Sequence, residues 1–302
     1  MQVRHHLRNF SHLYIIGNGF DLYHGLPTSY GHFHDYVKEH DNELTELIDK
    51  YYLPKKLDFW NDFEENLGNF DDDLLREYCQ KYFEDYGCDN WRDAFHHDYQ
   101  YELDRIIDRI TLGLRECFCN WLSQISFDGL EKKIIPIERN AYYLTFNYTC
   151  TLEKIYDIPT QNILHIHGTF KGHDNDRIVY GHGGHPYIVE KDIDDPRIAE
   201  GEEIIKDYFA KTKKPVMQII HKYQKFFYKM ITNVTNVTII GHSMNEIDYP
   251  YFKRIGNSIK ERTDWAYYYH SMKDIDSCLQ CLGNRLKYKG DKLHFLPYPY
   301  KM

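Results

Sequence analysis

The sequence predicts an α/β fold built on a mainly parallel β-sheet, and three observations support this prediction. Short apolar runs rich in β-branched and aromatic residues recur along the chain, among them residues 13–16, 141–146 and 237–240. Segments with helical periodicity separate these runs, and such alternation is typical of βαβ units. Several runs end in glycine or polar residues, as strands do at the carboxyl edge of a parallel sheet. We therefore expect a Rossmann-like sheet with a large helical insertion.

The composition favours one packed domain in a reducing compartment. Of the 302 residues, 42% are hydrophobic and 16% aromatic, and we expect residues 1–302 to form a single α/β domain. A net charge of −9 argues against a broad basic face for nucleic acid. The seven cysteines lack the spacing of a disulfide framework or zinc ribbon, and no apolar run approaches the ~18 residues of a membrane span. These features indicate a cytoplasmic protein that contacts no membrane.

The first predicted strand, residues 13–16, runs directly into the turn Gly17-Asn18-Gly19. Glycines allow a sharp turn and the close approach of a ligand to the backbone, so this turn suits the phosphates of a nucleotide. The pattern by itself is equally compatible with a tight turn before a surface helix, and both interpretations stay open at this point.

The helical insertion is expected at residues 32–125, after the first strand. The acidic run at residues 71–73 can cap one of its helices. Its longest part, residues 91–125, carries apolar side chains at three- and four-residue spacing without proline, which predicts one long helix or two in line. The stripe that we place in the core consists of Tyr99, Leu103, Ile106, Ile110, Leu114, Phe118, Trp121 and Ile125.

The second half of the chain supplies the remaining strands. They are expected within residues 141–146, 162–168, 178–180, 237–240, 265–269 and 293–296. The acidic segment at residues 192–203 contains one proline and one glycine, which indicates an exposed loop or lid.

Four predicted strands end in small or polar residues. Because parallel strands leave a sheet at the same edge, residues far apart in sequence should converge there on one crevice. The four clusters are Gly17-Asn18-Gly19-Phe20-Asp21, Thr145-Phe146-Asn147-Tyr148, His165-Ile166-His167-Gly168 and Gly241-His242-Ser243-Met244-Asn245. The sequence therefore predicts a shared site at the carboxyl edge.

These clusters also resemble the motifs of a known family. Asn18-Gly19-Phe20-Asp21-Leu22, followed by Gly25-Leu26-Pro27-Thr28-Ser29-Tyr30, resembles the opening motif of the AbiH family of phage abortive-infection proteins. Its later motifs resemble Phe146-Asn147-Tyr148-Thr149, His165-x-His167-Gly168 and Gly241-His242-Ser243-x-Asn245-x-x-Asp248. More distantly, the same order resembles the SIR2-like domains of bacterial anti-phage NAD hydrolases. The resemblance runs from about Leu13 to Asp248, and the helical block is matched only in position.

The resemblance implies an antiviral effector with a SIR2-like fold that binds and hydrolyses NAD or a related nucleotide, with no required cofactor and no metal. It implies His167 as the catalytic histidine and Asn147 as the asparagine that orients water or the ribose. The remaining motif residues would bind the nucleotide, with the glycines at the phosphates and the loop from Gly241 at the adenosine side; they are Gly17, Asn18, Gly19, Phe20, Gly168, Gly241, His242, Ser243, Asn245 and Asp248. The zinc-binding cysteines of sirtuin deacetylases are missing, so protein deacetylation is not implied.

Hydrolysis of the N-glycosidic bond fits these residue types. Breaking the bond between nicotinamide and ribose builds positive charge on the sugar, so the step needs a held ribose, a positioned water and a nearby negative group such as Asp21. A neutral His167 can take the proton and Asn147 can orient the oxygen. Asp21 would alternatively cap the helix that follows the turn.

Two other functions are compatible with the sequence. A metal-dependent phosphodiesterase or nuclease could take its ligands from several side chains, namely His165, His167, His182, His185 and His242 with Asp21 or Asp248. Against it, His165 and His167 alternate on a strand and should point to opposite faces. A non-catalytic nucleotide-binding sensor would need the same glycine turn. One expected partner is a small-molecule nucleotide. Because a toxic activity must be held off until infection, we also expect a second copy of the chain or a phage-derived trigger to control it.

Overall fold

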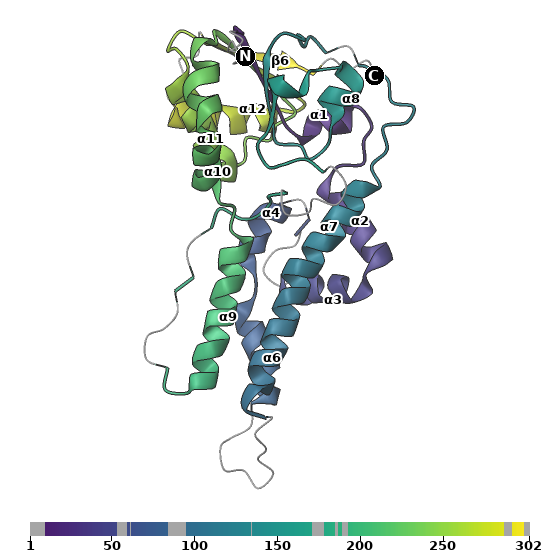
Figure 1. The fold of residues 1–302 in the computed structure, drawn as a ribbon, viewed down its shortest axis with the longest axis vertical. Coiled ribbons are helices and arrows are strands. Elements are labelled where there is room, and N and C mark those ends of the chain that lie inside the picture. The colour runs from purple at the N-terminus through teal and green to yellow at the C-terminus, as the bar shows by residue number, and fades with distance from the viewer. Residues whose placement is uncertain are drawn as a thin grey trace, which may run out of the picture. The chain divides into compact units, whose positions relative to one another are not determined.

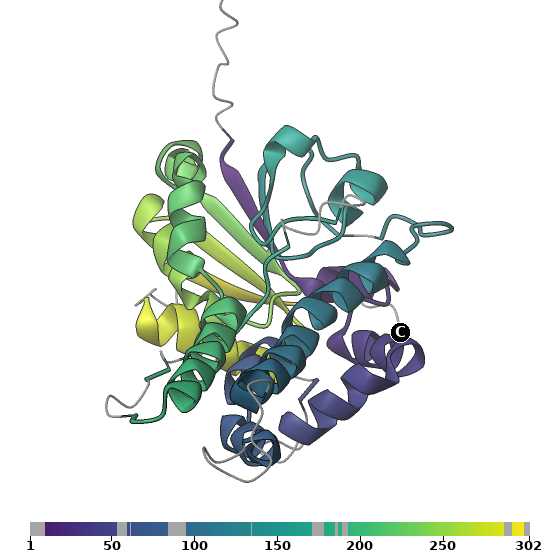
Figure 2. The ribbon, with the colours of Figure 1, turned by 60° about the horizontal axis from the view of Figure 1, so that its bottom comes forward.

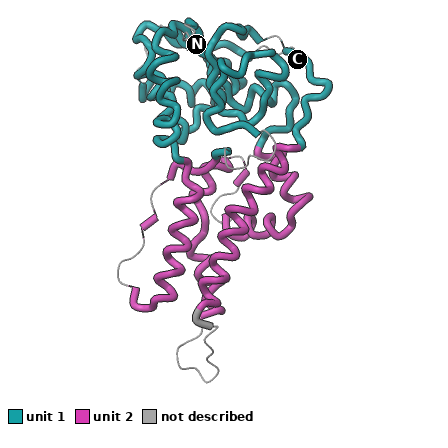
Figure 3. Tube along the Cα trace, viewed as in Figure 1, with its two compact units in different colours: residues 1–29, 124–179, 215–302 teal, residues 30–123, 180–214 magenta. Residues whose placement is uncertain are grey.

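The computed structural model describes residues 10–52, 59–60, 62–83, 95–133, 135–170, 178–184, 187–188, 193–286 and 292–298. The chain divides into two compact units (Figure 3). Unit 1 comprises residues 1–29, 124–179 and 215–302, and unit 2 comprises residues 30–123 and 180–214. Unit 2 overlaps the insertion expected at residues 32–125 and takes in residues 180–214 as well.

Unit 1 is built on a six-stranded sheet in which the paired strands of the described residues are all parallel (Figures 1 and 2). The spatial order is β3-β2-β1-β4-β5-β6. The strands are β1 (His12–Ile16), β2 (Tyr142–Thr145), β3 (Ile163–His165), β4 (Asn236–Ile240), β5 (Asp264–Tyr269) and β6 (Leu293–Pro297). The direction of progression reverses between β1 and β4, which is the topological switch point of a doubly wound sheet. The predicted α/β, Rossmann-like fold is confirmed.

The side chains of β1 alternate between two cores, because successive residues of a strand point to opposite faces. Leu13 and Ile15 belong to one core, together with residues of α10, α11 and α12. Tyr14 and Ile16 belong to the other, with residues of α1 and α8. These helices are α1 (Asn18–Tyr23), α8 (Thr151–Tyr156), α10 (Val216–Lys222), α11 (Tyr249–Ser258) and α12 (Met272–Cys278). The sheet is therefore covered on both faces, as the apolar character of its central strands requires.

Short helical turns complete the connections of unit 1. The 3₁₀ turns are η4 (Thr160–Asn162), η7 (Ile231–Asn233) and η8 (Glu246–Asp248), and the π-helical turns are η6 (Phe226–Met230) and η9 (Leu279–Arg285). Turn η8 follows β4 and leads directly into α11, so it lies at the carboxyl edge of the sheet.

The loops that follow β1 and β4 touch through glycines. The Gly17 amide donates to the Ile240 carbonyl at 2.9 Å, and the Gly19 amide donates to the Gly241 carbonyl at 2.8 Å. A Cβ at Gly19 would lie 2.8 Å from the Cα of Gly241, and a Cβ at Gly241 would lie 2.3 Å from the nitrogen of Phe20. Because no side chain fits between the two loops, glycine is required on both sides of the switch point.

Unit 2 is helical in its described residues. Its helices are α2 (Tyr30–His40), α3 (Asn42–Tyr51), α4 (Phe63–Asn66), α5 (Asp72–Cys79), α6 (Phe95–Asp108), α7 (Leu114–Ser123) and α9 (Pro196–Thr212), with 3₁₀ turns η1 (Leu67–Asn69) and η2 (Gln80–Tyr82). The π-helical turn η3 (Arg109–Gly113) joins α6 to α7 in one line (Figure 1). The predicted long helix is confirmed from Phe95 onward, and its apolar stripe is buried from Tyr99 to Trp121. Residues 91–94 of the prediction lie outside the described residues. Ile125 lies beyond the end of α7 and is half-buried.

The prediction of an exposed loop or lid at residues 192–203 is wrong from Pro196 onward, and residue 192 lies outside the described residues. Helix α9 begins at Pro196, and the Asp195 side chain caps it by accepting a hydrogen bond from the Arg197 amide at 2.9 Å. Proline is tolerated in the first turn of a helix because its missing N–H would have no partner there. Gly201 lets α9 approach α6, since a Cβ there would lie 2.6 Å from the ring of Tyr99.

The strand predicted at residues 178–180 is also absent from the described residues. Shortly after these residues, His182 forms an isolated β-bridge with Lys213. Gly181 has a φ of 150°, and a Cβ there would lie 2.2 Å from the Thr212 carbonyl oxygen. The run of glycines that follows Tyr180 breaks the extended conformation before a strand can form.

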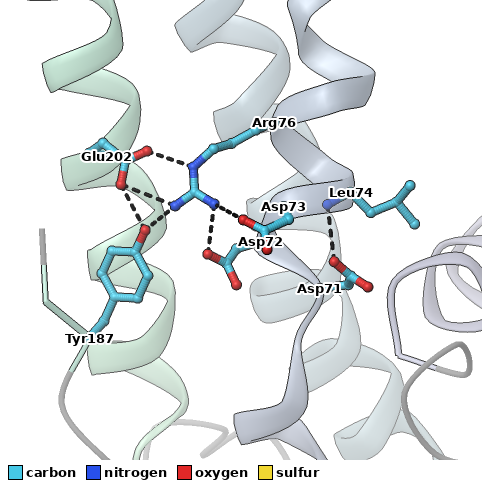
Figure 4. A network of polar contacts seen from close by, with 7 residues as sticks. All are labelled: Asp71, Asp72, Asp73, Leu74, Arg76, Tyr187 and Glu202. Carbon is cyan, nitrogen blue, oxygen red and sulfur yellow. Dashed lines mark hydrogen bonds and ion pairs between the residues drawn. The ribbon is translucent and has the colours of Figure 1, made fainter. Parts of the chain in front are cut away.

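An arginine joins α5 to α9 inside unit 2 (Figure 4). The Arg76 guanidinium donates to Glu202 at 2.6 Å, to Asp72 at 2.8 Å and to Asp73 at 3.0 Å. The Tyr187 hydroxyl donates to the other oxygen of Glu202 at 2.7 Å. Burial alone would raise the pKa of Glu202, but the hydrogen bonds from Arg76 and Tyr187 outweigh it and hold that pKa below its usual value.

The predicted cap at residues 71–73 is confirmed, because Asp71 accepts a hydrogen bond from the Leu74 amide at 3.0 Å.

None of the helices within the described ranges combines the length and the apolar character that a bilayer crossing demands.

We predict that Gly241→Ala destabilises the protein far more than Gly25→Ala. Both glycines have a positive φ, of 68° and 84°, so each alanine carries a left-handed backbone cost of about 1–2 kcal/mol. A Cβ at position 241 would collide with backbone, whereas a Cβ at Gly25 would have no atom of the described residues within 4 Å. Urea unfolding should show a loss of at least about 3 kcal/mol for Gly241→Ala. Equal losses for the two variants would contradict the contact at the switch point.

Two neighbouring glutamates of α9 give a second prediction. Glu202→Gln should lower the free energy of unfolding by about 1–3 kcal/mol, because the new amide group would face the donors of Arg76 and Tyr187. Glu203→Gln should change it by less than about 0.5 kcal/mol, because the Glu203 side chain is 60% exposed and pairs only with the exposed Lys206 among the contacts described. Thermal and urea unfolding of both variants measure the difference, and indistinguishable curves would rule out a stabilising role for the Arg76 network.

Candidate functional site

The carboxyl edge of the sheet in unit 1 carries two polar clusters. The first, which we name the Asp21 cluster, consists of Asp21, Asn147, Thr149 and Thr151. The second, which we name the histidine–carboxylate cluster, consists of His167, His242 and Asp248. All seven residues are at least nine-tenths buried. The residues come from the segments that follow β1, β2, β3 and β4, which end at the same edge of the parallel sheet. They lie in two clusters, and the single shared crevice stays a prediction.

Asp21 is fully buried and its two oxygens are both occupied. The Thr149 hydroxyl donates to Oδ2 at 2.5 Å and the Thr151 hydroxyl to Oδ1 at 2.6 Å. Burial is the largest influence on the carboxyl and raises its pKa to about 6, although hydrogen bonds from Thr149, Thr151 and Asn147 oppose this shift. These contacts tie α1 to the start of α8. Asp21 thus links two elements through the threonines, which is a different role from capping α1.

The side-chain amide of Asn147 is buried, and only one of its two polar atoms has a hydrogen-bond partner among the described residues. Its side chain donates a hydrogen bond to Asp21, and its backbone amide donates to the Thr145 hydroxyl at 3.1 Å. The residue is 6% exposed, and its Oδ1 has no hydrogen-bond partner within the described ranges. Leaving a buried acceptor unsatisfied costs about 1–3 kcal/mol, so such an atom is a natural place for a donor from a ligand or water.

The histidine–carboxylate cluster places one carboxylate between two imidazoles. Asp248 Oδ2 lies 3.5 Å from His242 Nε2, and Asp248 Oδ1 lies 3.8 Å from His167 Nε2. The Met244 amide donates to His242 Nδ1 at 2.9 Å, so in the neutral ring the proton resides on Nε2, facing the carboxylate. The Tyr267 hydroxyl donates to the His242 carbonyl at 2.9 Å and fixes the loop that carries this ring.

Aromatic side chains surround the two histidines. The Phe146 ring lies 5.2 Å from the ring of His167 and 4.3 Å from that of His242, measured between centroids. Tyr251 lies 5.6 Å from His167, and Phe252 lies 5.1 Å from His242. These rings give the histidines an apolar surrounding, in which electrostatic interactions are stronger than in water.

Several other residues that the sequence assigned to nucleotide binding have contacts that fix loops. The Asn18 amide donates to the Thr28 carbonyl at 2.7 Å, and Phe20 is fully buried. Asn245 accepts from the Ile247 amide at 3.3 Å, and Ser243 is exposed. Gly168 has a φ of 85° in the turn after β3. The amides of Gly17 and Gly19 donate to carbonyls across the switch point, so the phosphate-binding role of this turn stays a prediction.

The donor sets around the histidines do not favour a metal ion. His165 Nε2 lies 3.0 Å from Glu153, and the rings of His165 and His167 meet different neighbours. His182, in unit 2, uses Nε2 toward the Phe209 carbonyl and Nδ1 toward the Gly184 amide. The Nε2 of His242 carries a proton and has no lone pair for a metal. In the part of the chain that is described, no group of three or more histidine, cysteine, aspartate or glutamate side chains could hold an ion. His185 lies outside the described residues.

Sequence analysis did not assign a role to Thr149, Thr151 or Phe146. The two threonines are the partners of Asp21, and Phe146 is the ring that both histidines contact. A signal was present, because two threonines within three residues follow Asn147 directly after a predicted strand. The sequence did not indicate that these two hydroxyls donate to Asp21, which lies far away near the N-terminus.

Residues 13–269 match the family described as "Bacteriophage abortive infection AbiH". The match covers most of the chain and includes both clusters. No curated protein matches the sequence.

We predict that the stability difference between Asp21→Asn and the unaltered protein depends on pH. The pKa of Asp21 is about 6 when folded, against an ordinary value of 3.8, so between these values the folded state binds more protons than the unfolded state. The contribution of Asp21 to stability is therefore fully present below pH 3.8 and is lost as the pH rises through about 6. Asparagine is neutral throughout.

The free energy of unfolding of Asp21→Asn, relative to the unaltered protein, should therefore increase between pH 4.5 and 7.5. Urea unfolding at intervals of half a pH unit measures it. Asp128→Asn, at an exposed position of unit 1, controls for the loss of one charge. A flat difference for Asp21→Asn, parallel to that of the control, would show that Asp21 titrates normally.

Proposed function

This chain belongs to the AbiH family of bacteriophage abortive infection proteins, and we propose that it binds NAD or a related nucleotide and hydrolyses its N-glycosidic bond. The family indicates a role in defence against phage. The nucleotide and the reaction are our proposal, and the contacts of the carboxyl edge support them.

One observation carries the proposal, and it is the unsatisfied Oδ1 of Asn147. This acceptor is buried, and its amide nitrogen is committed to Asp21, so the side chain cannot rotate to exchange the two atoms without losing that hydrogen bond. An acceptor held in this way suits a hydroxyl or water whose proton it can receive. A ribose hydroxyl and the attacking water are such donors, and both occur at the bond that would be broken.

The position of the clusters also supports a nucleotide. In open α/β sheets, ligands bind outside the carboxyl ends of the strands at the switch point, and here that point lies between β1 and β4. Asp21 lies in the segment after β1 and His242 lies in the segment after β4. Each cluster therefore has a residue in one of the two segments that meet at the switch point.

The proposed reaction uses the residues as follows. Water forms a bond to C1′ of the ribose while the bond from C1′ to the nicotinamide nitrogen breaks, and the electron pair of that bond neutralises the pyridinium ring. The leaving group is neutral and needs no acid. Asn147 orients the water and His167 takes its proton, while Asp21 holds Asn147 in place. The products are nicotinamide, ADP-ribose and one proton.

A third prediction tests this function directly. The full chain, incubated with NAD in the presence of a chelator, should release nicotinamide, and Asn147→Ala should lower the rate about 100-fold because it removes the orienting acceptor. Asn236→Ala makes the same change at the exposed amino end of β4 and should retain the full rate. Circular dichroism and unfolding curves establish that all three proteins are folded. The assay should span a range of protein concentrations, because we also propose that self-association or a phage-derived trigger controls when the protein is active.

The outcomes separate the alternatives. Release that the chelator abolishes would support a metal-dependent hydrolase. Binding of NAD by calorimetry without any release, at every concentration of the protein, would support a nucleotide sensor. Neither binding nor release, for NAD or for other nucleotides, would contradict the proposal.

A further inference from the structure

We propose that a cavity beside the outer strand β3 binds an acidic peptide segment of another protein, which places an apolar side chain in the cavity and its carboxylates against Lys222 and Lys225. The cavity lies in unit 1, where residues of β3, η4, η6 and the end of α10 line it. The inference goes beyond the proposed function, because it concerns a partner and needs no reaction at the carboxyl edge of the sheet.

The cavity is separate from the two polar clusters. Strand β3 is the outermost strand on one side of the described sheet. The turn η4 lines the cavity and directly precedes β3, so it lies at the amino end of that strand. The Asp21 cluster and the histidine–carboxylate cluster belong instead to segments that follow strands, at the carboxyl edge. A ligand in the cavity therefore occupies a site of its own.

The floor of the cavity is apolar. Phe226 is buried there, and Leu164 and Met230 are half-buried beside the core on that face of the sheet. The volume is about 240 Å³, below the roughly 300–1,000 Å³ of typical small-molecule sites. The cavity therefore has the size for one or two apolar side chains rather than for a whole organic ligand, and a side chain that fills such a pocket commonly anchors a protein partner.

The rim of the cavity is basic. Lys222 and Lys225 are exposed there, and none of the described residues that line the cavity is acidic. Residues 208–245 contain no aspartate or glutamate, although the net charge of the chain is −9. Within the described ranges Lys222 lies 5.2 Å from the ring of Tyr223, and neither lysine pairs with a carboxylate. Two such ammonium groups beside an apolar floor are complementary to a segment in which carboxylates flank an apolar side chain.

The peptide binds through its side chains rather than as an added strand. The Ile163 amide donates to the Thr160 carbonyl, and the His165 carbonyl accepts a hydrogen bond from the Gly168 amide at 3.2 Å. These local bonds use backbone groups at both ends of the three-residue strand β3. Because an added strand needs free backbone groups along the edge, β3 is a poor template for it. Selectivity then comes from the cavity and the two lysines.

The first test titrates the full chain with four synthetic peptides. Three peptides carry a central tryptophan–leucine pair flanked by glutamates, by glutamines or by lysines, and the fourth carries glutamates around two alanines. We expect the first peptide to bind at least 10-fold more tightly than the others, and less tightly as salt rises from about 50 to 300 mM, because exposed charges are screened. Methyl NMR signals of Leu164 and Met230, assigned from Leu164→Ile and Met230→Leu, should shift with the same affinity.

Two results of this titration would overturn the proposal. One is a dissociation constant weaker than about 1 mM for the peptide with glutamates around tryptophan and leucine. The other is binding that leaves both methyl signals unchanged.

Charge reversal provides the matched comparison. Lys222→Glu/Lys225→Glu should weaken binding of the glutamate peptide at least 10-fold and strengthen binding of the lysine peptide, because the attraction changes sign. Lys260→Glu/Lys273→Glu makes the same change at exposed positions of unit 1 outside the cavity and should leave both affinities unchanged. Circular dichroism and unfolding curves establish that both variants are folded. Equal losses in the two variants would mean that overall charge alone attracts the peptide, and the proposal would fall.

Two further measurements test other occupants of the cavity. Self-association in sedimentation velocity that Lys222→Glu/Lys225→Glu alone abolishes would assign the cavity to a second copy of the chain. A thymidine oligonucleotide that binds more tightly than every peptide, and is lost in the same variant, would assign the basic rim to nucleic acid. Either result overturns the proposal, and neither depends on whether the protein hydrolyses NAD.

Discussion

The contact on which the candidate site depends is one between backbones. The turn after β1 and the loop after β4 meet at Gly19 and Gly241, with an amide–carbonyl hydrogen bond of 2.8 Å and no room for a side chain. Asp21 lies two residues beyond the first glycine and His242 directly follows the second. Any displacement of the two loops would therefore move a member of each cluster. A backbone contact of this kind transmits position without the flexibility of side chains, which suits a site that must hold polar groups to a fraction of an ångström.

A second constraint is the dipeptide Phe146-Asn147 at the end of β2. Phe146 contributes its ring to the core that includes α11 and contacts both histidines. Asn147 instead bonds to Asp21, near the core that includes α1 and α8. Two consecutive residues thus serve two clusters, because neighbouring side chains of an extended segment point to opposite faces. This arrangement explains how the short segment after β2 contributes a side chain to each cluster.

Unit 2 is held together by contacts between helices that are far apart in the sequence. Helix α9, from a distant part of the sequence, is fastened to α5 by the interaction of Arg76 with Glu202 and to α6 by the close approach at Gly201. The aromatic and aliphatic stripe of α6 and α7 is buried over its full length. The π-helical turn between them adds one residue to a turn and lets both helices keep their apolar faces inward. The acidic residues of α5 and α9 thus have a structural explanation within the unit.

The sequence by itself determined the fold class, because strand and helix periodicities are local properties and glycine turns mark strand ends. It also determined which residues gather at the carboxyl edge, since all parallel strands must end there. It misjudged residues 192–203, whose charges and proline suit the start of a helix as well as a loop. Only the tertiary structure decided which polar groups pair. Asp21 meets Thr149 and Thr151, and Asp248 lies between two histidines, through contacts between segments far apart in the chain. No local pattern encodes such distances, because they are fixed by how the loops pack against one another at the switch point.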